Sequence, residues 1–197
     1  MNPAISDASA MTQIRFAVVD VETSGLSVQR HRVLQVAVVT VDGEGRVIDR
    51  WSSLVRPRNR WFFRLGPRHI HGLTRARLRS APPAGDVLAE LTSRLDGATF
   101  TAHNARFDAS FLQRLGSRHG AQLTLSPQLC TLALSRRLDP QRQLSHRLAD
   151  VTARYGITNE RPHDALEDAT ATAAVLPHLL RAHGVTTRDQ LSQVTDA

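Results

Sequence analysis

A strand pattern and a pair of carboxylates share one stretch of this sequence, Phe16-Ala17-Val18-Val19-Asp20-Val21-Glu22-Thr23-Ser24-Gly25-Leu26. Its β-branched and aromatic residues predict a buried strand, because such side chains pack well on a pleated sheet. Side chains of a strand alternate between its two faces. We therefore expect Asp20 and Glu22 to emerge side by side at the end of a strand that Gly25 terminates.

Two neighbouring carboxylates repel each other, and one of them stays protonated unless a cation lies between them. Mg²⁺ and Mn²⁺ take oxygen ligands of this kind. The pair is thus a candidate metal site. The alternative is that both acids lie past the strand end and are solvated. Acid-x-acid pairs are common, so the rest of the chain has to decide between the two.

Length and composition limit the class of protein. The 197 residues fit one domain with a single core, and 41% apolar and 22% charged residues are ordinary for a globular protein. No apolar run approaches the ~20 residues of a membrane span. The first residues lack the basic and apolar regions of a secretory signal, and we expect a disordered leader over residues 1–12. A lone cysteine, Cys130, agrees with a reducing compartment, so we expect a cytoplasmic protein.

The net charge of +7 comes from arginine, because the 25 basic residues include no lysine. No acid occurs between Asp49 and Asp86, and arginines are frequent there, among them Arg56, Arg58, Arg60, Arg64, Arg68, Arg75, Arg77 and Arg79. A long segment of one sign favours a polyanionic partner. A solvated, partly mobile surface loop is an equally weighted alternative.

Hydrophobic periodicity predicts a three-strand antiparallel meander, followed by helices that alternate with strands. The meander strands are expected over residues 14–22, 33–41 and 46–55. Helices are expected over residues 86–95, 104–118, 131–138, 146–155 and 164–183, and Pro177 should kink or divide the last of them. Two further short strands are expected over residues 98–102 and near 123–125. This order indicates a mixed sheet covered by helices.

Two further acidic stretches occur at the starts of predicted helices. Asn104 and Asp108 share one helix face, and Phe107 lies on another that suits either the core or a base-stacking wall. Asp108 could equally do no more than complement the positive helix N-terminus. The third stretch contains His163, Asp164, Glu167 and Asp168, in which the acids could be ordinary caps and the histidine a surface residue.

Taken together, the three stretches provide what two-metal phosphodiester hydrolysis requires. Two cations ~4 Å apart stabilise the attacking and leaving oxygens, and a base activates the water. The chain resembles the DEDDh (DnaQ-like) 3′→5′ exonucleases, the family of the epsilon proofreading subunit of bacterial DNA polymerase III. The motifs that carry the resemblance are residues 19–26, residues 103–108, and His163 with Asp168 five positions later. Residues 70–74 and 144–157 also resemble family segments, and the likeness covers roughly residues 15–180.

The resemblance implies a ribonuclease H-like α/β fold, with a mixed five-stranded sheet in an exonuclease domain over residues 13–184 and a short helix or tail over 185–197. It implies two divalent ions, Mg²⁺ or Mn²⁺, held by Asp20, Glu22, Asp108 and Asp168. The family spacing selects Asp168 over Asp164 and Glu167, and it makes His163 the general base. It also implies that the 3′-terminal nucleotides contact Thr23, Gly25, Leu26, His71, Asn104 and Phe107.

The expected substrate is a DNA 3′ end, and products should be nucleoside 5′-monophosphates. RNA stays open as the substrate, because no residue settles recognition of the 2′-hydroxyl. A non-catalytic, basic nucleic-acid-binding module is a further alternative, against which the intact ligand set argues. Contact with a DNA polymerase is open too. We expect a stand-alone exonuclease, or one that joins a larger assembly through its globular surface, and no association with membranes.

Overall fold

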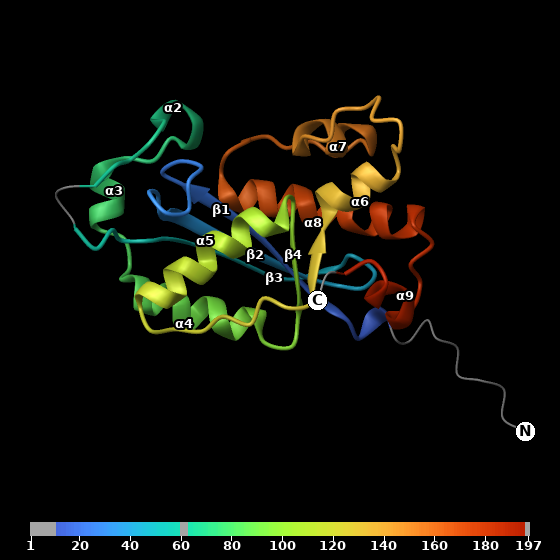
Figure 1. Ribbon diagram of the computed structural model, residues 1–197, viewed down its shortest axis with the longest axis horizontal. Helices are drawn as coiled ribbons and strands as arrows, with labels where there is room; N and C mark the ends of the chain where they lie inside the picture. Colours follow the sequence, from blue (N-terminus) through green and yellow to red (C-terminus); the bar gives the residue numbers. More distant parts are fainter. Residues whose placement is uncertain (1–10, 60–62, 196–197) are drawn as a thin grey trace, which may run out of the picture.

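A five-stranded mixed sheet runs through the centre of the molecule (Figure 1). The computed structural model describes residues 11–59 and 63–195. The strand order is β3-β2-β1-β4-β5. Pairing is antiparallel between β1, β2 and β3 and parallel from β1 through β4 to β5. The strands are β1 (Arg15–Thr23), β2 (Val33–Asp42), β3 (Val47–Leu54), β4 (Thr99–Ala102) and β5 (Gln128–Cys130).

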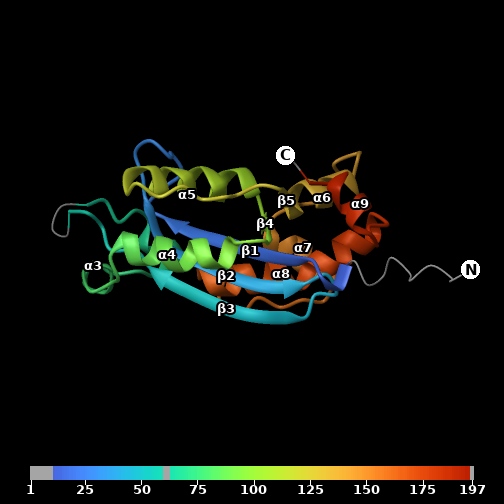
Figure 2. The ribbon, with the colours of Figure 1, turned by 90° about the horizontal axis from the view of Figure 1, so that it is seen from below.

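Helices cover both faces of this sheet and make a three-layer architecture (Figure 2). The helices α4 (Ala84–Leu95) and α5 (Ala105–Arg118) pack on one face. The other face carries α6 (Thr131–Arg137), α7 (Leu148–Arg154), α8 (Ala165–Ala182) and α9 (Arg188–Ser192). Because both faces are covered, β2 is buried along its whole length, which explains its nearly continuous apolar run. The predicted fold class is confirmed.

The ends of most predicted elements agree with the structure to within about two residues, but one expectation was wrong. No strand forms near residues 123–125. The fifth strand is Gln128–Cys130, because the chain first meets β4 at Pro127, whose carbonyl accepts a hydrogen bond from Phe100. Pro177 does not divide α8, which is one helix of 18 residues. Buried side chains on both sides of the proline, including Val175 and Leu179, hold its two halves on one core.

The arginine-rich segment has a small core of its own. It contains two short helices, α2 (Arg68–His71) and α3 (Arg75–Arg79), joined through Gly72 in the left-handed region. Its buried residues Phe63, Leu65, Leu73 and Leu78 pack against Leu34 of β2. The described part of this segment is therefore anchored to the sheet, while Arg60 lies outside the described residues.

Residues 1–10 of the expected leader also lie outside the described residues. Met11 is buried and packs into the core that α8 covers. Among the described residues, no helix has the length and apolarity to cross a membrane.

Candidate active site

The C-terminal end of β1 brings three of the predicted carboxylates together. Asp20 and Glu22 leave β1 two residues apart, and Glu22 is buried. Because β4 runs parallel to β1, the helix that follows it, α5, begins beside the same strand end. Asp108 in the first turn of α5 is buried, and its Oδ1 accepts a hydrogen bond of 3.1 Å from the backbone N–H of Val21.

The fourth carboxylate, Asp168, comes from the first turn of α8 on the opposite face of the sheet. Two donors fix its oxygens: Asn159 Nδ2 at 2.5 Å from Oδ1, and the backbone N–H of His163 at 3.1 Å from Oδ2. The neighbouring acids have other partners. Asp164 caps α8 by accepting from the N–H groups of Leu166 and Glu167, and Glu167 pairs with Arg161. Of these three acids, Asp168 is the one that has a carboxylate oxygen within 4.8 Å of a ligand atom of Glu22.

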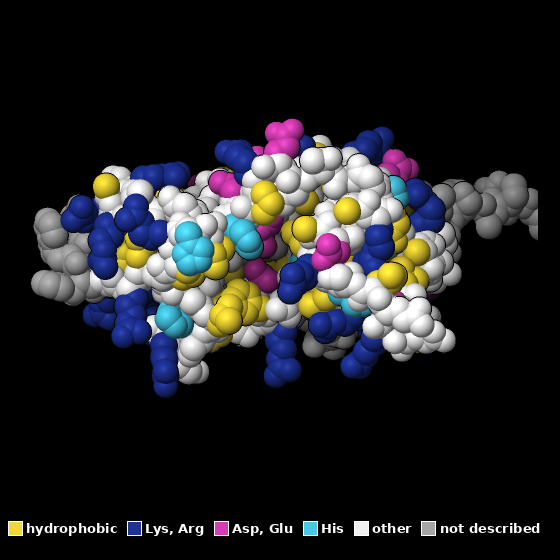
Figure 3. Space-filling model, turned by 90° about the horizontal axis from the view of Figure 1, so that it is seen from above, with side chains coloured by type: hydrophobic (Ala, Val, Ile, Leu, Met, Phe, Trp, Pro, Cys, Tyr) yellow, Lys and Arg dark blue, Asp and Glu magenta, His cyan; other side chains and the backbone are white. Residues whose placement is uncertain are grey.

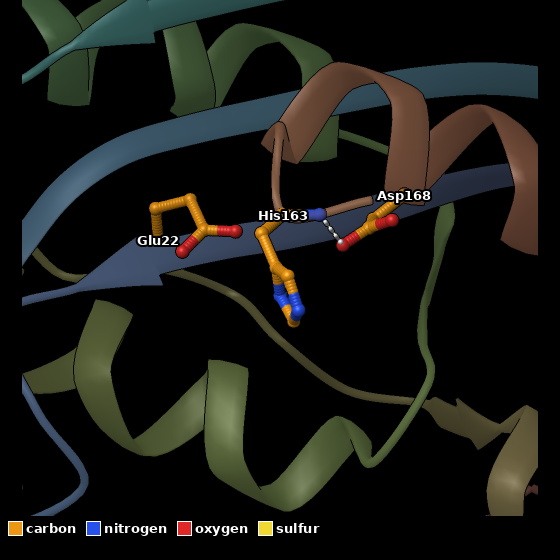
Figure 4. Close-up of side chains that lie close together, drawn as sticks. All are labelled: Glu22, His163 and Asp168. Carbon is orange, nitrogen blue, oxygen red and sulfur yellow. Dashed lines mark hydrogen bonds between the residues drawn. The ribbon is translucent and has the colours of Figure 1, made fainter. Parts of the chain in front are cut away.

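His163 lies between the two elements. One ligand atom each from Glu22, His163 and Asp168 lies within 4.8 Å of the others (Figure 4). The backbone of His163 has φ 68°, in the left-handed region that residues other than glycine rarely adopt. Such local strain is common at functional sites, where the surrounding structure holds it in place. The imidazole is exposed, so it can reach a substrate from solvent.

Within the described part of the chain, burial and mutual repulsion outweigh the groups that favour ionisation of these acids. Burial, followed by the charges of Asp108 and Asp168, raises the pKa of Asp20 well above its usual range. Burial and Asp168 raise the pKa of Glu22 to about 8. Burial also raises the pKa of Asp108 and of Asp168. Packed carboxylates that resist ionisation bind a divalent cation well, because the cation supplies the missing positive charge.

The residues fit the divalent ions that the sequence implies. The four carboxylates offer only oxygen ligands, which hard cations such as Mg²⁺ and Mn²⁺ prefer. After burial, the charges of Asp108, Asp168 and Glu22 all raise the pKa of Asp20, so these acids act on one another electrostatically. His163 is close enough to serve as a ligand or as a base toward a water in the same space.

The predicted substrate residues of the glycine turn lie directly after β1. Thr23 Oγ1 donates to the carbonyl of Gly25 at 2.9 Å and closes the turn. Gly25 has φ 148°, and a Cβ at this position would come within 2.6 Å of the His31 ring, so no larger residue fits. Leu26 is 84% exposed although it is apolar.

Two of the predicted substrate residues lie at the start of α5. Asn104 is exposed and precedes α5 with φ 78°, in the left-handed region. Phe107 is half-buried, and its ring centroid lies 4.9 Å from that of Phe111 in the core. Phe107 thus combines a supported ring with an accessible edge. Figure 3 shows acidic and histidine side chains in the middle of this face, with arginine side chains gathered toward one end.

His71 is not brought to the acidic cluster. It is buried in the arginine-rich segment, where Nε2 lies 3.1 Å from the carbonyl of Leu65 and Nδ1 accepts from the N–H of Leu73 at 3.0 Å. Both ring nitrogens are therefore occupied within the segment. The adjoining Gly66 packs on Ser24 of the glycine turn, and a Cβ there would lie 2.4 Å from the Ser24 carbonyl. His71 shapes the segment that supports this turn.

Sequence reasoning missed Asn159 and His31. Asn159 lies in an irregular loop nine residues before Asp168, where no periodic pattern marks it. His31 Nδ1 lies 3.3 Å from Ser24 Oγ and its ring faces Gly25, a contact that depends on how the loop between β1 and β2 folds back. Neither residue could be found from spacing alone.

Buried acids at the end of a central strand, joined by a histidine from a helix start, make a candidate active site of a nuclease. A family model described as Exonuclease (RNase_T) matches residues 17–176, so the chain belongs to this exonuclease family. The resemblance drawn from the motifs is confirmed.

Individual relatives agree with this assignment. The chain is 32% identical over 188 residues to the PolC-type DNA polymerase III of Lacticaseibacillus paracasei, covering 92% of this chain and 13% of that protein. It is 28% identical to the DNA polymerase III subunit epsilon of Aquifex aeolicus, covering 84% of this chain and 80% of the subunit. The chain thus spans only about an eighth of its PolC-type relatives.

The fold is also similar to solved structures. E. coli Exonuclease I in complex with a dT13 oligonucleotide superposes with a TM-score of 0.76 at 22% identity, covering 92% of this chain and 43% of that one. The zinc-bound form of the same enzyme with single-stranded DNA gives a TM-score of 0.77 at 23% identity. At this identity the likeness shows a shared fold.

Proposed function

We propose that this chain is a 3′→5′ exonuclease that releases nucleoside 5′-monophosphates from the 3′ ends of single-stranded DNA. The observation that supports it most is the convergence of four carboxylates and one histidine at the end of β1. These carboxylates are removed from solvent, and this burial raises the pKa of all four acids. Burying several carboxylates together costs folding free energy, so a purely structural role does not explain the cluster. Binding divalent cations does explain it.

Each residue has a role in this proposal. Asp20, Glu22 and Asp168 would hold one divalent ion, and Asp20 with Asp108 a second, Mg²⁺ or Mn²⁺. Such ions supply positive charge to the attacking and leaving oxygens of the phosphodiester. His163 takes a proton from the attacking water. Asp168 positions His163 by accepting a hydrogen bond from its backbone N–H.

The substrate end would lie between the glycine turn and α5. Thr23, Gly25 and Leu26 contact the terminal nucleotide from one side, and Asn104 and Phe107 contact the last two nucleotides from the other. Stacking on an aromatic ring is tolerant of sequence, which suits an enzyme that removes any base.

DNA is the favoured substrate, since several relatives are chains of DNA polymerase III and the similar Exonuclease I structure contains a DNA oligonucleotide. The same relatives favour work beside a DNA polymerase, in proofreading or repair, as a second proposal. RNA trimming by the same chemistry remains the alternative. A non-catalytic nucleic-acid-binding role is disfavoured, because the acids and the histidine are all present and converge.

Degradation assays distinguish these substrates. End-labelled single-stranded DNA, duplex DNA and RNA of one sequence are incubated with the chain in Mn²⁺, in Mg²⁺ and in excess chelator. We expect single-stranded DNA to be shortened fastest, and only with metal. Asp20→Asn is the matched inactive variant, because it keeps the shape of the side chain. Faster loss of RNA than of DNA would reassign the substrate, and equal turnover in chelator would overturn the metal roles.

A further inference from the structure

A cavity lined by arginines lies on the α4–α5 side of the sheet. It is a cavity of about 750 Å³ whose charged lining includes Arg32, Arg56, Arg58, Arg118 and His119. These residues come from the start of β2, the chain after β3 and the end of α5. None of the described residues that line the cavity is acidic. Segments far apart in the sequence thus bring their basic side chains together around one cavity.

The arginines that line this cavity have no carboxylate partner within the described ranges, residues 11–59 and 63–195. Among the described residues, none of the lining arginines, Arg32, Arg56, Arg58 and Arg118, forms an ion pair with a carboxylate, nor does Arg114, whose charge acts on Arg118. The Nε atoms of Arg32 and Arg114 are buried, and within the described part of the chain neither has a hydrogen-bond partner. A buried donor without an acceptor is costly, and a bound anion would satisfy it.

The electrostatics agree with this geometry. Burial, and then the charges of Arg114 and Arg32, lower the pKa of Arg118, so the three guanidinium groups repel one another. Helix C-termini attract cations, which accounts for an arginine at the end of α5. It does not account for Arg32, Arg56 and Arg58, which belong to other elements. Clustered arginines with forked donors are the usual receptor of phosphate groups.

The cavity lies at the same end of the sheet as the acidic cluster. Thr23 of β1 pairs with Val33 of β2, which lines the cavity, and the Ser24 N–H donates to the Arg32 carbonyl at 3.0 Å. Helix α5 connects the two sites, with Asp108 in its first turn and Arg118 in its last. A helix of 14 residues is ~21 Å long, so a ligand that touches both sites is an extended chain.

We propose that this arginine cavity binds backbone phosphates of the single-stranded nucleic acid several nucleotides upstream of its 3′ end. The assignment of the ligand rests on the proposed function, while the phosphate chemistry rests on the cavity itself. The cavity adds affinity that grows with strand length, and it keeps the strand on the protein while the 3′ end is shortened.

Binding of oligonucleotides of increasing length tests the proposal without turnover. The Kd values of 5′-labelled oligothymidylates of 2 to 16 nucleotides are measured by fluorescence anisotropy in excess chelator, at several salt concentrations. Wild type should show a step to higher affinity at the length that reaches the cavity. In Arg118→Gln and in Arg56→Gln this step should be lost, and the salt slope for long strands should fall by about 0.7 for each phosphate contact removed.

Arg181→Gln is the matched control, because Arg181 is also exposed in the last turn of a long helix, α8, and does not line the cavity. It should keep the step and the slope. A step retained in both cavity variants, no step in wild type, or the same loss in Arg181→Gln would overturn the proposal. Release of mononucleotides in Mn²⁺ is scored separately. A chain with the length step but without mononucleotide release would contradict the proposed function and leave the phosphate site standing.

Discussion

The N–H of Val21 donates to Asp108 Oδ1 at 3.1 Å, between the two acids of β1. The carboxylate of Asp108 thereby links α5 to the central strand β1 and adds its charge to the acidic cluster. Asp108→Asn keeps an acceptor for Val21 and removes the charge, whereas Asp108→Ala leaves a buried N–H unpaired. We expect both variants to lose most activity. Only Asp108→Ala should also lose about 1–3 kcal/mol of unfolding free energy, measured by denaturant titration in chelator. Equal stability of the two would refute this structural role.

The raised pKa values predict how stability depends on pH without metal. Glu22, with a pKa of about 8 in the fold against 4.5 ordinarily, keeps a proton that the unfolded chain releases. The folded state therefore binds more protons over this range, and its stability falls as pH rises from about 4.5 to 8. Asp20→Asn removes one charge from the cluster, so the metal-free variant should be more stable than wild type, increasingly so toward pH 8.

In the difference in stability between variant and wild type, the contributions of other titrating groups cancel. Burial lowers the pKa of His103, which gives a pH dependence of the opposite sign in both proteins. Saturating Mn²⁺ should reverse the order and make wild type the more stable protein, because metal replaces the protons of the acids. A wild type that is more stable than Asp20→Asn at pH 8 in chelator would contradict the account.

His163→Ala tests the general base. Removing a positioned base should lower turnover by on the order of 10²–10⁴. Metal affinity, measured by calorimetric titration with Mn²⁺, should change little, because the four carboxylates are the expected ligands. A large loss of Mn²⁺ binding would make the histidine a ligand, and unimpaired turnover would make it a bystander. Asp168 should keep its donor in this variant, since the His163 contact is made by the backbone N–H.

The arginine-rich segment should contribute affinity rather than chemistry. Arg75 and Arg77 of α3 are exposed, and the guanidinium of Arg75 lies 4.9 Å from the centroid of the Phe63 ring. Replacing both by alanine should raise KM for single-stranded DNA and flatten its salt dependence, with kcat nearly unchanged. Steady-state kinetics at three salt concentrations measure this. If the salt dependence of KM is unchanged, the segment is a solvated surface loop that does not contact the substrate.

The placement of Asp20 and Glu22 was predictable, because side chains two residues apart in a strand point to the same face. The choice among Asp164, Glu167 and Asp168 was not. Spacing leaves all three near a helix start, and only family resemblance selected Asp168. In the structure Asp164 is used by the helix cap and Glu167 by Arg161, which is the physical reason for that choice.

Features that depend on irregular chain could not be read from the sequence. Asn159 and His31 reach the site through loops, which have no period to analyse. The strand Gln128–Cys130 has three residues, too few for a periodic signal. His71 was expected at the substrate because its segment resembles a family segment. Its ring nitrogens contact Leu65 and Leu73 within that segment, and its contact with the substrate stays a prediction.

The central claim is metal-assisted removal of nucleotides from a 3′ end, and one time course tests it most directly. A single-stranded DNA oligonucleotide with a 5′ label and a radioactive 3′-terminal nucleotide is incubated with wild type in Mn²⁺, and products are resolved from the first seconds onward. We predict that the terminal label appears at once as nucleoside 5′-monophosphate, while the 5′-labelled strand shortens one nucleotide at a time. Internal cuts, nucleoside 3′-monophosphates, or the same products in excess chelator would contradict the account.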